Sequence, residues 1–398
     1  MVKSRLDTYF VALLVCIYVI FSPPFIFSAY IPLPVRMILE VVPFLLLLIA
    51  IRSERNNLFV YKYMFVWSML VLMMFLNSDS AFNSVVYSFV KLLFLVSILS
   101  VCYNSNTMFY VIRNVWFVFW FFVPSFVVVT FFVYQFDIVS FTHLSFDEIS
   151  ETAGYNYYTN IFFGNIIKSN ILGIPTSRVC WYVFEPSMLA FFLGLNILLA
   201  DSVYSHSKYV TKFKILNFCA GCLTFSLTFY VFFMFYVVMK LLSYGFLRRV
   251  SLLTIPAVLV VAVCYIYLIL MDSDAGRFTS IDDRLLRLEI GWFFINNNTL
   301  LTFLFGNGLG VSAVVFDRGI SSGILAIFVE RGFLVFIFLV FIFYKYTKHN
   351  KALLLYILFY HFTFELVWYP ALLIAIAISY AASYRKGNFL DLDHRGKE

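Results

Sequence analysis

Long runs of apolar residues, separated by short polar segments, follow one another along the whole chain. Most runs have the roughly 17–25 residues that cross the hydrocarbon core of a bilayer as a helix. They lie at Thr8–Ser28, Val35–Ile51, Leu58–Leu76, Val85–Tyr103, Val115–Val133, Trp181–Ala200, Ile215–Lys240, Leu252–Met271, Ile324–Tyr344, Leu353–Val367 and Pro370–Ala382. This pattern predicts an all-α polytopic membrane protein.

The run Ile215–Lys240 is long for a single crossing and has basic residues near both ends. Two lysines precede it and two arginines follow it, and short basic loops are typical of the cytoplasmic side. We therefore expect two short helices that meet near Thr224–Thr228. Counted in this way, the chain makes about twelve crossings.

Lys and Arg are confined to alternate loops, which fixes the expected orientation. Opposite loops, such as residues 77–84, have none. The basic set therefore marks the cytoplasm, with both termini inside. It comprises Lys3, Arg5, Arg52, Arg55, Lys62, Lys208, Lys212, Lys214, Arg248, Arg249, Lys345, Lys348, Lys351, Arg385 and Lys386.

Composition supports the membrane class and excludes several others. The chain is 63% hydrophobic and 12% charged, with a mean hydropathy of +0.93, far beyond a soluble globular protein. The net charge of +7 follows from the basic cytoplasmic loops and gives no reason to expect nucleic acid as a partner. No small-residue cleavage site follows the first run, so we expect a retained span. Residues 1–398 are expected to form one membrane domain with two long periplasmic loops, at about 134–180 and 272–323.

The first long loop combines carboxylates with tyrosines in the segment FDEISETAGYNYY. Tyr155 and Tyr157 are candidates for sugar binding, because ring faces stack on sugar C–H groups while carboxylates accept hydroxyl hydrogens. An alternative is a solvated loop whose tyrosines rest at the membrane interface.

A charged pair follows this loop in RVCWYVFEPSMLAFF. Arg178 stands before a span and Glu185 at its first turn, where burying a charge costs about 2.5 kcal/mol or more unless it is paired. The two residues are candidates for function, and an Arg178–Glu185 pair that only anchors the helix is the alternative.

The second long loop carries Arg277, Arg284 and Arg287 on the side where positive residues are scarce. If DRLLRLEIGW is helical, Arg284 and Arg287 share one face, and Leu285, Leu286 and Ile290 can lie in the membrane interface. Guanidinium forks suit a diphosphate. The alternative is an Asp283–Arg287 pair on a helix that binds anionic headgroups.

Four ionisable residues lie inside predicted spans, where a charge needs water, a partner or an anionic ligand. Lys91 and Glu330 stand in separate spans, and His361 and Glu365 are four residues apart in another, where they pair structurally or line a cavity.

Cofactor motifs are weak in this chain. Asp272-Ser273-Asp274 matches the metal-binding DxD pattern, which is short enough to occur by chance. FGNGLG at 305–310 lacks the lysine of a nucleotide loop, and the cysteines of FCAGC are better explained by packing. We expect neither a metal nor another cofactor.

The order of these motifs resembles the O-antigen polymerase (Wzy) family. The resemblance is carried by RVCWYVFEPSMLA, then RFTS…RLLR…W, LFGNGLG and SSGILAIFVERGFLVF, across roughly Ser177 to Phe341. The related O-antigen ligases usually have a His about four residues before a Leu in the last segment. Here Ser321 stands four residues before Leu325, which favours a polymerase. Both groups often have Ser-Arg in the broken middle span, whereas Leu227 follows Ser226 here, so that arginine's role is not carried over.

The resemblance implies a GT-C-like glycosyltransferase of the bacterial inner membrane. Such an enzyme moves the growing chain from its undecaprenyl pyrophosphate onto an incoming lipid-linked repeat unit at the periplasmic face. A chain-length regulator is a possible partner besides the lipid-linked donor and acceptor.

The residues themselves suit this chemistry. Fixed cations stabilise the charge that builds on a departing pyrophosphate, which predicts a cradle of Arg178, Arg277, Arg284, Arg287 and Lys91, with Arg287 also catalytic. A general base must accept the proton of the attacking hydroxyl. Glu185 is the first candidate for that base and Glu330 is the second.

Two other functions remain alternatives. An O-antigen ligase would transfer finished chains to another acceptor. A flippase would move the same lipid-linked sugar across the membrane, although its cations should be spread through the bundle rather than gathered in two external segments.

Overall fold

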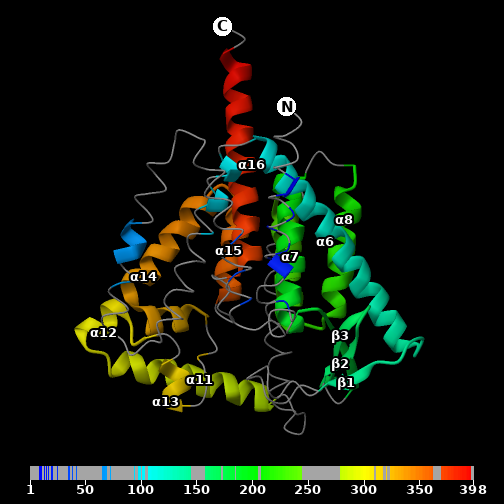
Figure 1. Cartoon of the computed structure of the whole chain (residues 1–398), viewed down its shortest axis with the longest axis horizontal. Helices are drawn as coiled ribbons and strands as arrows, with labels where there is room; N and C mark the ends of the chain where they lie inside the picture. Colours follow the sequence, from blue (N-terminus) through cyan, green and yellow to red (C-terminus); the bar gives the residue numbers. More distant parts are fainter. Residues whose placement is uncertain are drawn as a thin grey trace. The chain divides into compact units, whose positions relative to one another are not determined.

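The structure is a computed structural model that describes part of the 398-residue chain (Figure 1). The described residues are 9–10, 13, 15, 17, 19–20, 25, 35, 38, 42, 65–69, 72, 94, 97–99, 101–103, 106–144, 157–171, 174–183, 185–204, 208–243, 278–308, 311–316, 320, 323–361 and 369–395. The fold is mostly helical, as predicted.

Three described helices are long and apolar enough to cross a membrane: α6 (Asn106–Gln135), α7 (Pro186–Val203) and α14 (Gly323–Thr347). Shorter apolar helices cover Thr228–Val237, Lys351–His361 and Pro370–Arg385. These elements agree with the predicted class of helical membrane protein. The predicted span Leu252–Met271 lies outside the described residues.

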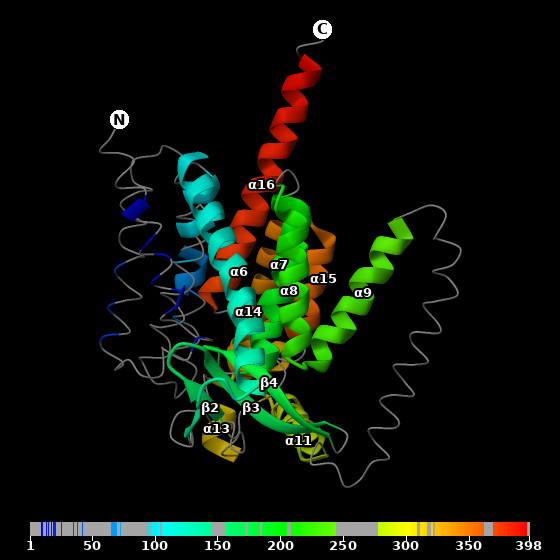
Figure 2. The same cartoon turned by 90° about the vertical axis from the view of Figure 1, so that its right-hand side faces the viewer.

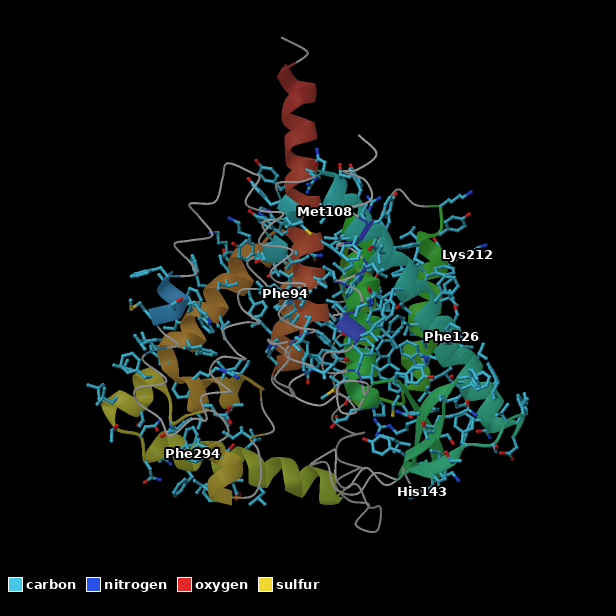
Figure 3. The ribbon with its side chains drawn as sticks, in the orientation of Figure 1. Phe94, Met108, Phe126, His143, Lys212 and Phe294 are labelled. Atoms are coloured by element: carbon cyan, nitrogen blue, oxygen red, sulfur yellow. The ribbon has the colours of Figure 1, made fainter. Side chains whose placement is uncertain are left out.

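The long helices differ in how far protein covers them. The apolar window of α7 is 78% buried, against 33% for α6 and 39% for α14. Helix α6 presents a stripe of exposed apolar side chains at helical spacing, including Val118, Phe122 and Phe126; Figure 3 labels Phe126. Protein therefore encloses α7, whereas α6 and α14 each keep a face that can meet lipid.

The predicted break in the Ile215–Lys240 run is confirmed. Helix α8 (Val210–Leu223) ends and α9 (Leu227–Ser243) begins within that run, and Figure 2 shows the two as separate helices. The break falls at Thr224–Ser226, inside the predicted Thr224–Thr228 segment.

The all-α prediction was wrong for the first long loop, which contains a four-stranded antiparallel sheet. Its strands are β1 (Thr142–Leu144), β2 (Tyr157–Asn160), β3 (Gly164–Ile171) and β4 (Ile174–Trp181), in the order β1-β2-β3-β4. Residues 164–167 of β3 are all buried. Because both faces of the strand are covered there, its sequence lacks the polar–apolar alternation by which a half-buried strand is recognised.

The chain divides into two compact units, which are described separately. Unit 1 comprises Met1–Phe121, Leu195–Lys214 and Leu286–Glu398; unit 2 comprises Phe122–Gly194 and Ile215–Leu285.

In unit 2, the two faces of the sheet have different neighbours. On one face, Lys168 lies over the ring of Tyr158, 4.1 Å from its centroid, and near Tyr134 at the end of α6. Its hydrogen bond to Tyr134 is the largest cause of a raised Lys168 pKa. Thr130 of α6 donates to the Phe163 carbonyl oxygen at 2.7 Å. This face therefore packs on α6, and the opposite face carries Tyr157, Ile167 and Arg178, which are matched in register.

Helix α11 (Phe278–Asn296), whose residues from Leu286 onward belong to unit 1, confirms the predicted helix around DRLLRLEIGW. The predicted place of Ile290 in the membrane interface was wrong, because Ile290 is buried and packs with Phe294 and with Val329 of α14. Figure 3 labels Phe294. Leu286, which was also expected at the interface, is 42% exposed.

Helix α14 is kinked at Gly332, where φ is 80° and ψ is 171°. The kink leaves the carbonyls of Val329 and Glu330 without their usual i+4 donors. The FGNGLG loop supplies replacements after the short helix α12 (Leu300–Phe305). The backbone N–H of Asn307 donates to the Val329 oxygen at 2.9 Å, and that of Gly308 donates to the Glu330 oxygen at 3.1 Å. The FGNGLG loop, which lacks the lysine of a nucleotide-binding loop, therefore supplies the hydrogen bonds that the kinked helix needs.

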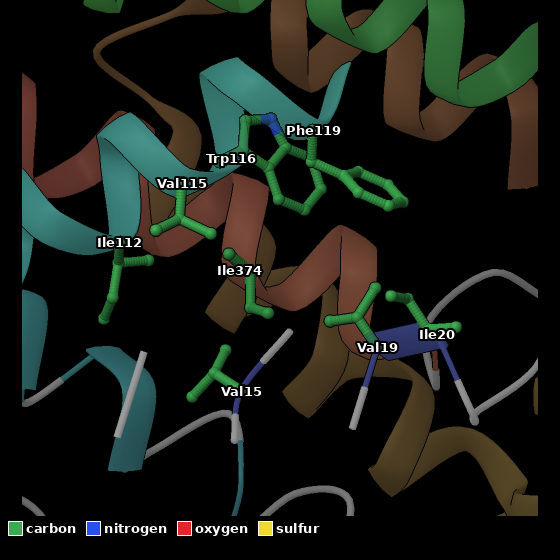
Figure 4. Close-up of a pocket in the computed structure, with 8 residues that line it drawn as sticks. All are labelled: Val15, Val19, Ile20, Ile112, Val115, Trp116, Phe119 and Ile374. Carbon is green, nitrogen blue, oxygen red and sulfur yellow. The ribbon is translucent and has the colours of Figure 1, made fainter. Parts of the chain in front are cut away.

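A small cavity of about 30 Å³ lies in unit 1 and is lined entirely by apolar side chains. It is shown in Figure 4, and its lining residues are Val15, Val19, Ile20, Ile112, Val115, Trp116, Phe119 and Ile374. A cavity of this size holds about one small molecule such as water, and an apolar one stays dry. It offers no room for a sugar or a pyrophosphate.

We predict that Gly332→Ala destabilises the purified protein. An added Cβ would lie 2.4 Å from the backbone nitrogen of Gly306 and 2.4 Å from the Leu304 oxygen, and a non-glycine residue at positive φ adds roughly 1–3 kcal/mol of strain. Gly291→Ala is the matched control, because its Cβ would meet the movable end of the Leu325 side chain. Thermal unfolding in detergent should show a clear fall in Tm for Gly332→Ala and a smaller change for Gly291→Ala. Equal Tm values for the two variants would contradict this account of the kink.

Candidate functional site

The break between α8 and α9 is built by residues that compete for backbone hydrogen bonds. The Thr224 hydroxyl donates to the Gly221 carbonyl oxygen at 2.7 Å and accepts the Ser226 N–H at 3.3 Å. Phe225 has a φ of 47°, in the left-handed region that ends a helix. Thr224 and Ser226 are both buried. Side chains of this kind favour helix ends over helix interiors, which explains why the apolar run breaks here.

Arg178 reaches this break from β4, the last strand of the sheet. Its Nε donates to the Thr224 carbonyl oxygen at 3.2 Å, an oxygen whose helical donor is lost at the break. The side chain is half-buried. Among the described residues, the guanidinium makes this one hydrogen bond. Its two terminal nitrogens therefore remain able to bind a ligand. Arg178 is thus held by one nitrogen and offers a planar fork with the others.

Glu185 immediately precedes α7 and follows Arg178 by seven residues. Its carbonyl oxygen accepts the N–H groups of Met188 and Leu189, both at 3.1 Å, and its carboxylate accepts the Ser187 hydroxyl at 3.0 Å. The helix thus starts at Glu185, with proline in the first helical position, where its missing N–H costs nothing. The carboxylate is half-buried at the N-terminus of the helix.

The charges of Arg178 and Glu185 both act on the buried Cys180 thiol. Burial raises the pKa of the Cys180 thiol, while the charge of Arg178 lowers this pKa and that of Glu185 raises it. Both charges therefore act on one buried atom. The anchoring Arg178–Glu185 pair that the sequence left open is replaced by the bond from Arg178 to Thr224.

Tyr157 does not suit the predicted stacking on sugars. Its side chain is 2% exposed on the sheet face that also carries Ile167 and Arg178. Stacking needs the whole ring face to be open to the sugar, so this packed ring does not suit it. Tyr155, the other tyrosine predicted to bind sugar, lies outside the described residues.

The predicted cations of the second loop are only partly described. Arg284 and Arg287 belong to α11, three residues apart, and helical geometry places them on one face. Their side chains lie outside the described residues, as do Arg277 and Lys91 altogether. Their share in the pyrophosphate cradle remains a prediction.

Glu330, the second candidate base, stands in unit 1 at the kink of α14. Its half-buried carboxylate is 3.5 Å from the Ser312 hydroxyl of α13 (Val311–Phe316), and its carbonyl accepts the Gly308 N–H. The structure thus gives Glu330 a clear part in joining the loop to the broken helix.

His361 ends α15 (Lys351–His361) and is 4% exposed. Its Nδ1 lies 2.7 Å from the Ile357 carbonyl oxygen, and its ring contacts Phe343. These contacts are typical of a histidine that packs within a helical core. Its predicted partner Glu365 lies outside the described residues.

No group of three His, Cys, Asp or Glu side chains that could hold a metal is found among the residues that the structure describes. The Asp272-Ser273-Asp274 pattern is outside that part.

Sequence reasoning missed two parts of this site. Thr224 was expected only as the place of a break, and nothing in the sequence linked it to Arg178, 46 residues earlier. Asn165, a buried residue on the Arg178 face of the sheet, was missed because no strand was expected there.

No protein-family model, curated protein or solved structure matches the chain.

Proposed function

We propose that this protein is a membrane-embedded glycosyltransferase that lengthens a lipid-linked polysaccharide, as O-antigen polymerases do. One observation carries the proposal: Arg178 is anchored through Nε on the Thr224 carbonyl, in the same region of unit 2 as Glu185, whose charge acts with that of Arg178 on the buried Cys180 thiol. A fixed guanidinium and a carboxylate in one region match the needs of a reaction with a diphosphate leaving group and a hydroxyl nucleophile.

In the proposed reaction, an acceptor sugar hydroxyl attacks the anomeric carbon of the donor chain. The new C–O glycosidic bond forms while the bond from that carbon to the phosphate oxygen breaks, and undecaprenyl pyrophosphate leaves with the electron pair. Glu185 accepts the hydroxyl proton. Arg178 stabilises the charge that grows on the leaving oxygen, which lowers the transition-state energy more than that of the ground state.

The remaining parts of the proposal come from the sequence. Arg277, Arg284, Arg287 and Lys91 complete the cradle, and Glu330 is the alternative base. The chain is proposed to make about twelve crossings in a GT-C-like arrangement in the bacterial inner membrane. Both termini are cytoplasmic and the site faces the periplasm, where a chain-length regulator could bind.

Purified protein given a defined lipid-linked oligosaccharide tests this function directly. We expect longer lipid-linked chains to form, because one repeat unit is transferred to another. Transfer of the chain exclusively to an acceptor other than a lipid-linked repeat unit would identify a ligase. Movement of the lipid without any new glycosidic bond would identify a flippase, and either result would refute the proposal.

We predict that Arg178→Lys loses most of its activity in this assay. The single ammonium of lysine can bind either the Thr224 oxygen or a phosphate, whereas the guanidinium can bind both. Loss of one preorganised donor typically lowers kcat by roughly 10²–10³-fold. Arg113→Lys is the matched control, since Arg113 is an arginine of α6 that bonds Asn114 and lies over Tyr110. Wild-type kcat in Arg178→Lys would remove Arg178 from the transition state.

Arg287→Ala tests the predicted second part of the cradle in cells. We expect the stably expressed variant to leave single capping units without long polysaccharide, because the leaving pyrophosphate loses a cation. Gel analysis of the cell-surface polysaccharide shows the chain-length distribution. A normal ladder would exclude Arg287 from the cradle.

A further inference from the structure

Asn165 is a buried amide whose donors are not used. It lies on β3, is 2% exposed, and its Nδ2 finds no hydrogen-bond partner among the described residues. A buried polar group left unsatisfied costs about 1–3 kcal/mol. Native proteins rarely keep such a group unless a ligand, a water or a catalytic role accounts for it.

The sheet register places Asn165 near Arg178 across a bulge, because Asn165 pairs with Trp181 and the register shifts between Asn165 and Ile166. Ile167 pairs directly with Arg178, and cross-strand partners share a face. Asn165 is two residues from Ile167 on β3, so its side chain is on that same face. One residue pair and the extra residue Cys180 of the bulge separate Asn165 from Arg178 along the ladder.

This face carries the hydrogen-bond donors of the site. Arg178 donates to Thr224 at the helix break and keeps its terminal nitrogens for a ligand, and the Asn165 amide adds two N–H groups without adding charge. Donors gathered at one place favour a ligand that only accepts hydrogen bonds. A diphosphate has several such oxygens, and its negative charge strengthens each bond.

We propose that Asn165 is a further substrate-binding residue, whose side-chain amide donates a hydrogen bond to a phosphate oxygen of the lipid-linked pyrophosphate held by Arg178. The proposal rests on the proposed function for the nature of the substrate. It assigns the unused donor to the substrate, so Asn165 lowers the stability of the protein without substrate and raises its affinity for substrate.

Asn165→Leu separates this role from a structural one. Leucine has nearly the same size and no unsatisfied donor, so the unliganded full-length protein in detergent should keep or raise its Tm. Binding of farnesyl pyrophosphate, measured by calorimetry, should weaken roughly tenfold or more, the value of a hydrogen bond to a charged group. Farnesol, which lacks phosphate, should bind both proteins equally.

Asn196→Leu is the matched control. Asn196 is also fully buried, but its Oδ1 accepts the Trp116 Nε1–H at 2.8 Å. Removing it leaves a buried indole N–H unsatisfied, so the Tm should fall while the affinity for farnesyl pyrophosphate stays at the wild-type value. The two substitutions thus have opposite expected effects on stability and affinity.

Two results would overturn the inference. One is a fall in Tm for Asn165→Leu like that of Asn196→Leu, together with unchanged affinity for farnesyl pyrophosphate, which would make Asn165 structural. The other concerns Asn165→Asp, which serves if the leucine variant does not fold. Aspartate replaces the donors by a negative carboxylate, and unchanged affinity in that variant would remove the phosphate contact.

The proposed function and this inference can fail separately. If the wild-type protein forms no glycosidic bond but its affinity for farnesyl pyrophosphate depends on Asn165, the proposed function fails and the binding role stands. If it polymerises normally and Asn165→Leu binds as tightly as wild type, the binding role fails and the function stands.

Discussion

Every backbone carbonyl in an apolar environment needs a hydrogen-bond donor, and this constraint is most severe where a helix breaks. The described part of the chain contains two breaks in apolar helices, and each finds its donors in a different way. At Gly332 of α14, the backbone of the FGNGLG loop donates to the released carbonyls. Between α8 and α9, the side chain of Arg178 donates to Thr224. The first break is closed by neutral peptide groups, whereas the second introduces a fixed positive charge.

That difference accounts for the proposed chemistry. An arginine recruited to satisfy a carbonyl is also oriented by it, because Nε is fixed while the terminal nitrogens stay available. Strand β4, which carries Arg178, leads into α7, which begins directly after Glu185. One short stretch of chain therefore supplies both the cation and the carboxylate. The unsatisfied amide of Asn165 on the same sheet face fits a site that is completed by its ligand.

The sequence predicted those features that depend on long-range hydropathy or on local breaking signals. The apolar runs corresponding to α6, α7 and α14, the break near Thr224 and the helix around Arg284 and Arg287 were all expected. The sheet was not, because β3 is buried on both faces and shows no period of two. The kink at Gly332 could not be predicted from the sequence either. A single glycine in an apolar run does not reveal which other part of the backbone packs against it. Ile290 matched an amphipathic pattern that is the same whether the apolar face meets lipid or protein, and in the structure it meets protein.

The most direct test of the account is a cryo-electron microscopy structure of the full-length protein in a lipid nanodisc with a lipid-linked pyrophosphate bound. The account predicts that phosphate oxygens lie at about 2.7–2.9 Å, the distance of a charge-assisted hydrogen bond, from the terminal nitrogens of Arg178, with Nε still on the Thr224 carbonyl. A diphosphate bound away from Arg178, or an Arg178 side chain that has left Thr224 to pair elsewhere, would contradict it.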